Sequence, residues 1–266
     1  MGEKIRIGAF VSGGGTNLQA VIDSCESGKI DGKMVFVGSD NPDAKGLVRG
    51  KKHGIPAFAV DYVRIIRDFK EKRENVELPC DFDLNNIFAK QSFLQKEFSD
   101  EKVKTFLMTR AIAEKKLLYE MRPYPFDLLI LAGFMRHLTP YFIDRVNTVP
   151  AKPRIMNIHP ALLPAFPGTD GYGDTYRYGC RVGGCTVHFI DYNEDSGPII
   201  DQRAFKIQED DTIDTIKEKG LKLEWELYPE CIQSFGQGRL KVVDMSYLTG
   251  HGNKIRRTVV KRIQPD

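Results

Sequence analysis

The sequence predicts an α/β fold in which a Rossmann-like, mostly parallel β-sheet carries helices on both faces. Residues 5–11 form a short β-rich run that leads into a glycine-rich loop, and apolar residues at helical spacing follow that loop. This order of strand, glycine turn and helix opens nucleotide-binding α/β units. Residues 126–133 form an uninterrupted apolar run, which is typical of a central parallel strand buried on both faces.

The first part of the chain continues this alternation of strands and helices. Leu18, Val21 and Ile22 recur at helical spacing behind the loop at residues 12–17. A turn cluster at residues 39–42 ends the next strand, and glycine closes a short helix whose basic residues come late. The elements predicted here are strands at 34–38 and 55–60 and a helix at 44–53.

Residues 64–120 differ from the rest of the chain, because they carry 12 basic and 11 acidic side chains. Apolar positions such as Phe88, Phe93, Leu94 and Phe98 indicate amphipathic helices around an irregular acidic stretch. We interpret the segment as a helical insertion at one edge of the sheet. A solvated helical face explains its charge most simply, and a surface for a partner is the alternative.

The second part of the chain returns to strand patterns. A strand at 154–158 stops at His159-Pro160, and strands at 185–190 and 198–202 form a pair around an acidic loop. A long helix at 212–235 follows, for which Asp210 or Asp211 is a suitable N-cap.

The composition excludes several classes of protein. Hydrophobic residues make up 41% of the chain, which is enough for a folded core, and the net charge of +3 gives no chain-wide footprint for nucleic acid. No apolar run approaches the roughly 20 residues of a membrane span. The N-terminus shows no targeting segment, and the five scattered cysteines indicate reduced thiols. We therefore expect a cytoplasmic protein.

Residues 12–17 are a candidate phosphate site. A glycine-rich loop at a helix N-terminus can bind a phosphate through backbone N–H groups and the helix dipole. The loop lacks the glycine spacing of dinucleotide-binding folds and the lysine of ATP-binding loops, so it suits a single terminal phosphate. A tight turn without a ligand is the alternative.

The segment Asn157-Ile158-His159-Pro160 is a candidate catalytic site. In an extended strand Asn157 and His159 point to the same side, at the carboxyl end where α/β folds place their sites. An amide donor and an imidazole can together stabilise the oxygen of a tetrahedral intermediate. A buried structural histidine is the alternative.

The acidic loop at residues 191–198 could supply a carboxylate beside that imidazole, which would favour the imidazolium. No motif for a serine or cysteine nucleophile is present, so the substrate itself must supply the nucleophile, most simply an amine. Cys180, Cys185 and His188 lack a second ligand pair, and we expect no metal site.

With these residues in place, the sequence resembles the folate-dependent formyltransferases, and within them the phosphoribosylglycinamide formyltransferases. The Asn-x-His-Pro-x-Leu-Leu-Pro run with a downstream aspartate is specific for folate formyltransferases, and the glycine-rich loop narrows the resemblance further. The matching stretches occur in family order at residues 11–20, 131–136, 157–168, 187–199 and 224–229.

The resemblance implies a reaction and a cosubstrate. The primary amine of glycinamide ribonucleotide would attack the formyl carbon of 10-formyltetrahydrofolate. Asn157 would donate to the formyl oxygen, His159 would stabilise the oxyanion, and Asp195 would keep His159 charged and relay the proton. Ribonucleotide contacts are implied for Gly15, Thr16, Asn17, Pro160 and Glu224, and folate contacts for Met135, Arg136, Leu138, Ile190, Asp191 and Glu194.

The resemblance also implies one formyltransferase domain over residues 1–242. Its N-terminal phosphate-binding half would span 4–125 with the insertion at about 64–120, and its catalytic and folate-binding half would span 126–242. Residues 243–266 would be a C-terminal extension. The partners expected are small-molecule substrates, without nucleic acid or membrane, and a homodimer is a further expectation from the family.

Two departures from the family pattern stand out. Relatives usually carry His and Ala in the segment at 169–179, which should here alter the folate-side wall. Leu221 stands where a polar neighbour of Glu224 is expected.

Three other functions remain as alternatives. Formyltetrahydrofolate hydrolase would use the same residues with water, but a regulatory domain normally precedes its catalytic domain. Formylation of another phosphorylated amine is the second alternative. The third is a non-catalytic binding protein on this fold, against which the intact Asn157, His159 and Asp195 argue.

Overall fold

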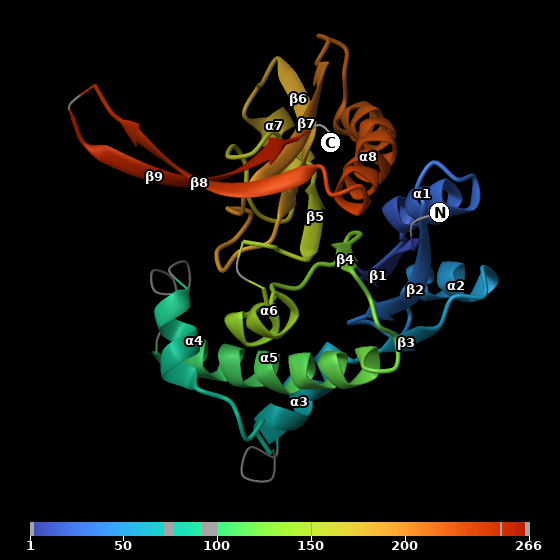
Figure 1. The fold of residues 1–266 in the computed structure, drawn as a ribbon, viewed down its shortest axis with the longest axis vertical. Helices are drawn as coiled ribbons and strands as arrows, with labels where there is room; N and C mark the ends of the chain where they lie inside the picture. Colours follow the sequence, from blue (N-terminus) through green and yellow to red (C-terminus); the bar gives the residue numbers. More distant parts are fainter. Residues whose placement is uncertain (1–2, 72–76, 92–99, 150, 251, 264–266) are drawn as a thin grey trace.

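The chain folds around one seven-stranded sheet (Figure 1). A computed structural model describes residues 3–71, 77–91, 100–149, 151–250 and 252–263. The strand order is β3-β2-β1-β4-β5-β6-β7, in which the first five strands are parallel, β6 pairs antiparallel with β5, and β7 pairs antiparallel with β6. This confirms the mostly parallel sheet. The strands are β1 (Ile5–Val11), β2 (Gly32–Ser39), β3 (Ala57–Ala59), β4 (Leu128–Leu131), β5 (Ile155–His159), β6 (Val182–Phe189) and β7 (Ile199–Lys206).

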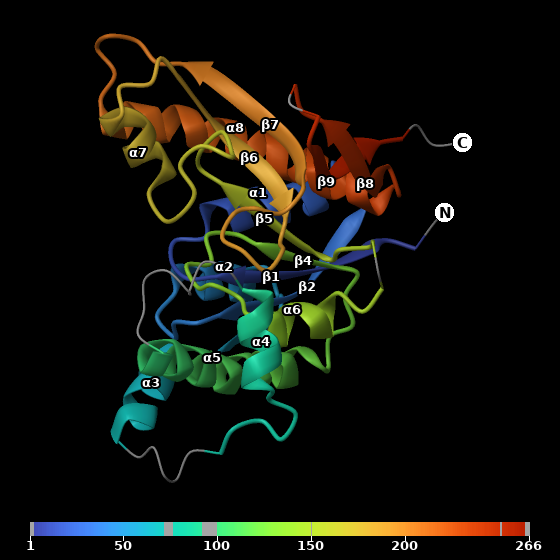
Figure 2. The ribbon, with the colours of Figure 1, turned by 90° about the vertical axis from the view of Figure 1, so that its left-hand side faces the viewer.

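Helices cover both faces of the sheet (Figure 2). Side chains alternate between two cores along β4, where Leu128 and Ile130 join one core and Leu129 and Leu131 the other. The apolar run in this strand thus reflects burial on both faces. One face packs against α1 (Thr16–Glu26), α2 (Lys45–Lys52) and α8 (Ile213–Gly236), and the other against α3 (Tyr62–Glu71), α5 (Asp100–Met121) and α6 (Pro140–Val146).

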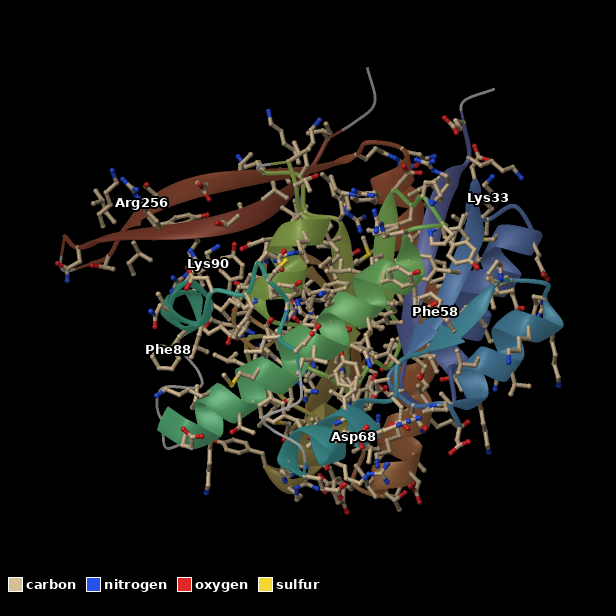
Figure 3. The ribbon with its side chains drawn as sticks, turned by 90° about the horizontal axis from the view of Figure 1, so that it is seen from below. Lys33, Phe58, Asp68, Phe88, Lys90 and Arg256 are labelled. Carbon is tan, nitrogen blue, oxygen red and sulfur yellow. The ribbon has the colours of Figure 1, made fainter. Side chains whose placement is uncertain are left out.

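The helical insertion packs against a face of the sheet, so our expectation of an edge position was wrong. Ile112, Ala113 and Leu117 of α5 are buried with the side chains of β1, β2 and β4, because this stripe of the charged helix is apolar. A smaller core joins α5 to α4 (Leu84–Lys90) and to α6. Figure 3 shows Phe88 and Lys90 of α4 from below. Phe93, Leu94 and Phe98 lie outside the described residues.

Helix α8 begins one residue later than expected. Its N-cap is Thr212, whose side chain accepts from the backbone N–H of Thr215, and the Thr215 hydroxyl accepts in return from the N–H of Thr212. Our prediction of Asp210 or Asp211 as the cap was therefore wrong. The Asp211 carboxylate instead accepts from the Lys219 ammonium group and from the Thr215 hydroxyl.

Helix α8 also packs against the central strands of the sheet. The Tyr228 hydroxyl lies 3.1 Å from the carbonyl oxygen of Leu131 and 2.8 Å from that of Met156. These carbonyls belong to the adjacent strands β4 and β5, and the one hydroxyl proton of this buried tyrosine is shared between them.

The end of the chain forms a two-stranded antiparallel ribbon, β8 (Leu240–Leu248) and β9 (Lys254–Arg262), which extends away from the sheet (Figure 1). Arg262 pairs with Asp201 of β7 at the base of the ribbon. Residue 242, our predicted domain boundary, falls inside β8.

Candidate active site

A cavity of about 650 Å³ opens at the carboxyl ends of β1, β4 and β5. The strand order reverses between β1 and β4, because β2 and β3 lie on one side of β1 and β4 and β5 on the other. Open α/β sheets bind ligands at such a switch point. All residues predicted to form the site line this cavity, and their roles stay predictions: Gly15, Thr16, Asn17, Met135, Arg136, Leu138, Asn157, His159, Pro160, Ile190, Asp191, Glu194, Asp195 and Glu224.

The glycine-rich loop turns directly into α1 beside this cavity. Gly15 is the N-cap of the helix and has a φ of 69°, a left-handed conformation that favours glycine. A Cβ atom here would lie 2.8 Å from the Cα of Gly46. The first turn of α1 contains no acidic residue, and its N–H groups have no partner within the helix. This end of α1 can therefore receive an anion.

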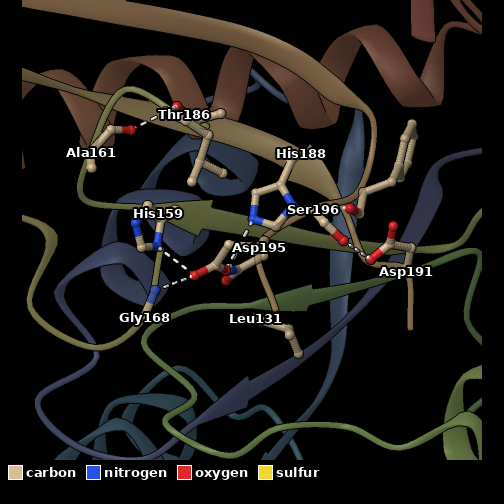
Figure 4. A network of polar contacts seen from close by, with 12 residues as sticks. Leu131, His159, Ala161, Gly168, Thr186, His188, Asp191, Asp195 and Ser196 are labelled. Atoms are coloured by element: carbon tan, nitrogen blue, oxygen red, sulfur yellow. Dashed lines mark hydrogen bonds and ion pairs between the residues drawn. The ribbon is translucent and has the colours of Figure 1, made fainter. Parts of the chain in front are cut away.

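His159 ends β5 and contacts Asp195 in the loop between β6 and β7 (Figure 4). His159 Nδ1 lies 3.2 Å from Asp195 Oδ2, and its Nε2 lies 2.8 Å from the carbonyl oxygen of Phe166. Because a carboxylate and a carbonyl both accept hydrogen bonds, this arrangement suits a ring with a proton on each nitrogen. The imidazolium form of His159 satisfies both neighbours.

Both acceptors of His159 lie on strained backbone. Phe166 has a φ of 54° and Asp195 a φ of 47°, a region that costs a non-glycine residue about 1–3 kcal/mol. The backbone N–H of Gly168 donates to Asp195 Oδ2 at 2.8 Å and helps to hold the carboxylate. Strain that the surrounding structure maintains in this way is common at functional sites.

A second histidine, His188 of β6, lies opposite Asn157 in the strand register. Asn157 Nδ2 lies 3.3 Å from His188 Nε2, and His188 Nδ1 lies 3.0 Å from the carbonyl oxygen of Phe189. This pattern fits a neutral ring that donates from Nδ1 and accepts at Nε2. Burial lowers the pKa of His188, although the charge of Asp195 opposes the shift. Asp195 thus lies between the two imidazoles, 3.2 Å from His159 Nδ1 and 3.6 Å from His188 Nε2, as Figure 4 shows.

Glu224 of α8 is buried at the other end of the cavity. Its Oε2 accepts from Asn17 Nδ2 and its Oε1 from the Tyr172 hydroxyl, each at 2.6 Å. Burial raises the pKa of Glu224, while these two hydrogen bonds lower it. Tyr172 belongs to α7 (Gly171–Arg177), in the segment that we expected to alter the folate-side wall. The structure brings this residue to Glu224, because α7 packs against α8, and the expected effect on the folate-side wall stays a prediction.

Two loops form the wall predicted to hold the cosubstrate. The loop after β4 carries Met135, whose N–H donates to Ser12 Oγ at 2.7 Å, and Arg136, which pairs with the buried Asp40 at 2.5 Å. The loop after β6 carries Asp191, whose carboxylate accepts from the Ser196 hydroxyl (Figure 4). Both loops are thus fixed by polar contacts to the rest of the fold or within themselves.

The helical insertion supports both of these loops. Glu114 of α5 accepts from the backbone N–H of Thr139 at 2.7 Å, directly after the loop that follows β4. Lys90 of α4, labelled in Figure 3, pairs with Asp144 at 2.6 Å. The other oxygen of Asp144 accepts from the Tyr192 hydroxyl in the loop after β6, also at 2.6 Å.

Comparison with known proteins identifies the family. The model of the formyl transferase family matches residues 5–232. A phosphoribosylglycinamide formyltransferase of Haemophilus influenzae is 31% identical over 92% of this chain and 94% of its own length. The chain belongs to the formyl transferase family.

Solved structures of formyl transferases have the same fold. Glycinamide ribonucleotide transformylase 1 from Symbiobacterium toebii is 32% identical, with a TM-score of 0.67 over 99% of this chain and 96% of that one. A formyltetrahydrofolate deformylase from Burkholderia mallei, at 19% identity, has a TM-score of 0.66 over 98% of this chain and 70% of its own. That second likeness concerns the fold alone.

In this formyl transferase, sequence reasoning missed His188 and Tyr172 as parts of the site. His188 could have been found, because it lies near the end of a strand predicted to lead into the acidic loop. It alternates with Thr186 on that strand, so both side chains point to the same face of the sheet. Tyr172 gave no signal of its own, because its position depends on how α7 packs against α8.

Within the described residues, no group of three or more His, Cys, Asp or Glu side chains is arranged to hold a metal ion. None of the helices in the described ranges combines the length and the apolar character needed to cross a membrane.

Proposed function

We propose that this chain is a phosphoribosylglycinamide formyltransferase. It transfers the formyl group of 10-formyltetrahydrofolate to the primary amine of glycinamide ribonucleotide, a one-carbon transfer of purine biosynthesis. The observation that carries this proposal is the convergence of Asn157, His159 and Asp195 on one cavity beside a glycine-rich helix N-terminus. Such a set stabilises an oxyanion and moves protons, and it leaves nucleophilic attack to the substrate amine.

The substrate amine attacks the formyl carbon, and a C–N bond forms. The Asn157 amide and the His159 imidazolium stabilise the negative oxygen of the tetrahedral intermediate. The bond from this carbon to N10 of the folate then breaks, and the proton lost by the amine reaches N10 through water held by Asp195. His159 Nε2 lies 2.8 Å from the carbonyl oxygen of Phe166, so its N–H must exchange that carbonyl for the formyl oxygen.

The same proposal assigns the two ends of the cavity. The phosphate of the ribonucleotide binds Gly15, Thr16 and Asn17 at the start of α1, with Pro160 and Glu224 alongside the ribose and glycinamide. The folate cosubstrate lies against Met135, Arg136, Leu138, Ile190, Asp191 and Glu194. The catalytic unit is residues 1–242, in halves of 4–125 and 126–242.

The test is the absorbance-followed conversion of 10-formyl-5,8-dideazafolate, with and without glycinamide ribonucleotide. We expect turnover only with the ribonucleotide present. Turnover without any amine would identify the protein as a formyltetrahydrofolate hydrolase. Turnover with another phosphorylated amine, but not with glycinamide ribonucleotide, would show that the acceptor is a different amine. No turnover in any condition would favour a binding protein. His53→Ala, a change outside the cavity, is the matched control for His159→Ala.

The proposal also covers location and assembly. All five cysteines are free, which fits the reducing cytoplasm. We expect small-molecule substrates, no nucleic acid and no membrane partner. A homodimer is expected from the family, and light scattering after size-exclusion chromatography tests it.

A further inference from the structure

Glu224 is held by two hydrogen bonds that come from different parts of the fold. The side chain is 4% exposed. Asn17 reaches Oε2 from α1, and the Tyr172 hydroxyl reaches Oε1 from α7, both at 2.6 Å. A buried carboxylate needs such donors, because burial without hydrogen bonds is costly. The two contacts also fix the rotation of the carboxylate plane relative to the cavity.

Gly220 makes room for the tyrosine. A Cβ atom at this position would lie 2.1 Å from Cζ and 2.2 Å from the hydroxyl oxygen of Tyr172. Gly220 precedes Glu224 by one turn inside the 24-residue helix α8. Glycine is less favourable than alanine in a helix interior, so its presence here needs a packing reason. The Tyr172 ring supplies that reason.

A further polar atom at this place is left for a ligand. Asn17 Oδ1 is buried and has no hydrogen-bond partner within the part of the chain that the structure describes. Its amide nitrogen is engaged by Glu224, so the oxygen is fixed in orientation. A carboxylate has about four acceptor positions, and Glu224 uses two of them here. The remaining acceptors of Glu224 and Asn17 Oδ1 suit a ligand that offers hydroxyl or N–H donors.

We propose that Tyr172, seated on Gly220, is a positioning residue that orients Glu224 and Asn17 for the donor groups of the acceptor substrate. Tyr172 acts through the carboxylate of Glu224, to which its hydroxyl donates. Leu221, where a polar neighbour of Glu224 was expected, has no polar side chain to do this. This inference rests on the proposed formyltransferase function, because the substrate class is a phosphorylated amine that carries hydroxyl groups. It concerns acceptor binding only and leaves the folate site and the transfer step unchanged.

The first test is Tyr172→Phe, which removes only the hydroxyl. We expect the KM for glycinamide ribonucleotide to rise about tenfold, the effect of one hydrogen bond. The KM for 10-formyl-5,8-dideazafolate and kcat should stay within about threefold, a split that a general loss of structure would not produce. Tyr176→Phe, at an exposed position on the same helix, is the matched control and should behave as the wild type.

The second test uses Gly220→Ala. In the presence of Tyr172 the added methyl group displaces the ring and should raise the same KM about tenfold. In a Tyr172→Ala background the methyl group has space, and Gly220→Ala should have no further effect. This dependence separates contact with the ring from a general effect on α8. Gly220→Ala in the wild-type background keeps the tyrosine hydroxyl, so it carries the test if Tyr172→Phe does not fold.

Two results would overturn the inference in an active wild-type enzyme. One is an unchanged ribonucleotide KM in Tyr172→Phe, and the other is an equal rise in both KM values. Calorimetric titration with the ribonucleotide alone gives the same comparison without turnover. A wild-type protein without formyl transfer would instead contradict the proposed function, so the two failures are distinguishable.

Discussion

Glu114 is the buried acid that joins the insertion to Thr139, directly after the loop that follows β4, and we expect its protonation to affect stability. Its side chain is fully buried on α5 and accepts from both the backbone N–H and the hydroxyl of Thr139. Burial raises the pKa of Glu114 to about 8, against the hydrogen bonds from Thr139, which lower it. The perturbation is Glu114→Gln, a neutral side chain of the same shape.

The sign and size of the effect follow from that pKa. An unfolded glutamate has its ordinary pKa of 4.5. Between pH 4.5 and 8 the folded protein keeps a proton that the unfolded chain has lost, so the free energy of unfolding falls as the pH rises. The slope is about 1.4 kcal/mol per pH unit, and the total loss at pH 8 is on the order of 5 kcal/mol. Above pH 8 the contribution stays constant.

The assay is urea unfolding followed by far-ultraviolet circular dichroism at pH 5, 6, 7 and 8. Glutamine can accept from the Thr139 N–H and donate to its hydroxyl, so it keeps both contacts without a titration. The stability of Glu114→Gln relative to the wild type should therefore rise by about 1.4 kcal/mol per pH unit. Glu120→Gln, at an exposed position of the same helix, should show no such trend. A flat difference for Glu114→Gln across this range would refute the reasoning.

Three further predictions concern the site. Asp195→Asn should lower kcat by at least about 100-fold, because it removes the negative charge 3.2 Å from His159 Nδ1. A kcat within tenfold of the wild-type value, with an unchanged pH–rate profile, would contradict this. Gly15→Ala should destabilise the protein by about 1–3 kcal/mol, since the left-handed backbone and the contact with α2 both exclude a methyl group, and an unchanged urea midpoint would refute it. Asp144→Ala releases the Tyr192 hydroxyl and should raise the folate KM about threefold, whereas a change confined to the ribonucleotide KM would argue against support of that loop.

The parts predicted from the sequence are those that local pattern determines. The apolar run of β4 reports burial on both faces, and the alternation of Asn157 and His159 places both side chains on the cavity side of β5. The glycine-rich loop could be placed at a helix start, because Gly15 is needed there for its positive φ. Each of these features is visible within a few consecutive residues.

The parts that were wrong or missed depend on contacts between distant residues. The charged sequence of the insertion hides the apolar stripe through which α5 covers a face of the sheet. Asp211 and Thr212 are both acceptable caps by residue type, and the reciprocal contact with Thr215 decides between them. Tyr172 and Glu224 are 52 positions apart in the sequence. No local sequence pattern predicts a contact over that distance.

The Tyr228 contact with β4 and β5 fixes the position of α8 along the sheet. Glu224 stands one turn before Tyr228 on this helix, so about 6 Å of helix rise separates the proposed acceptor site from the residue that anchors the helix to β4 and β5. The inserted helices under the sheet can vary in length without altering that interval. A single residue added between Glu224 and Tyr228 would rotate one of them by about 100° away from its partners. The spacing between Glu224 and Tyr228 is therefore fixed by the partners of both side chains.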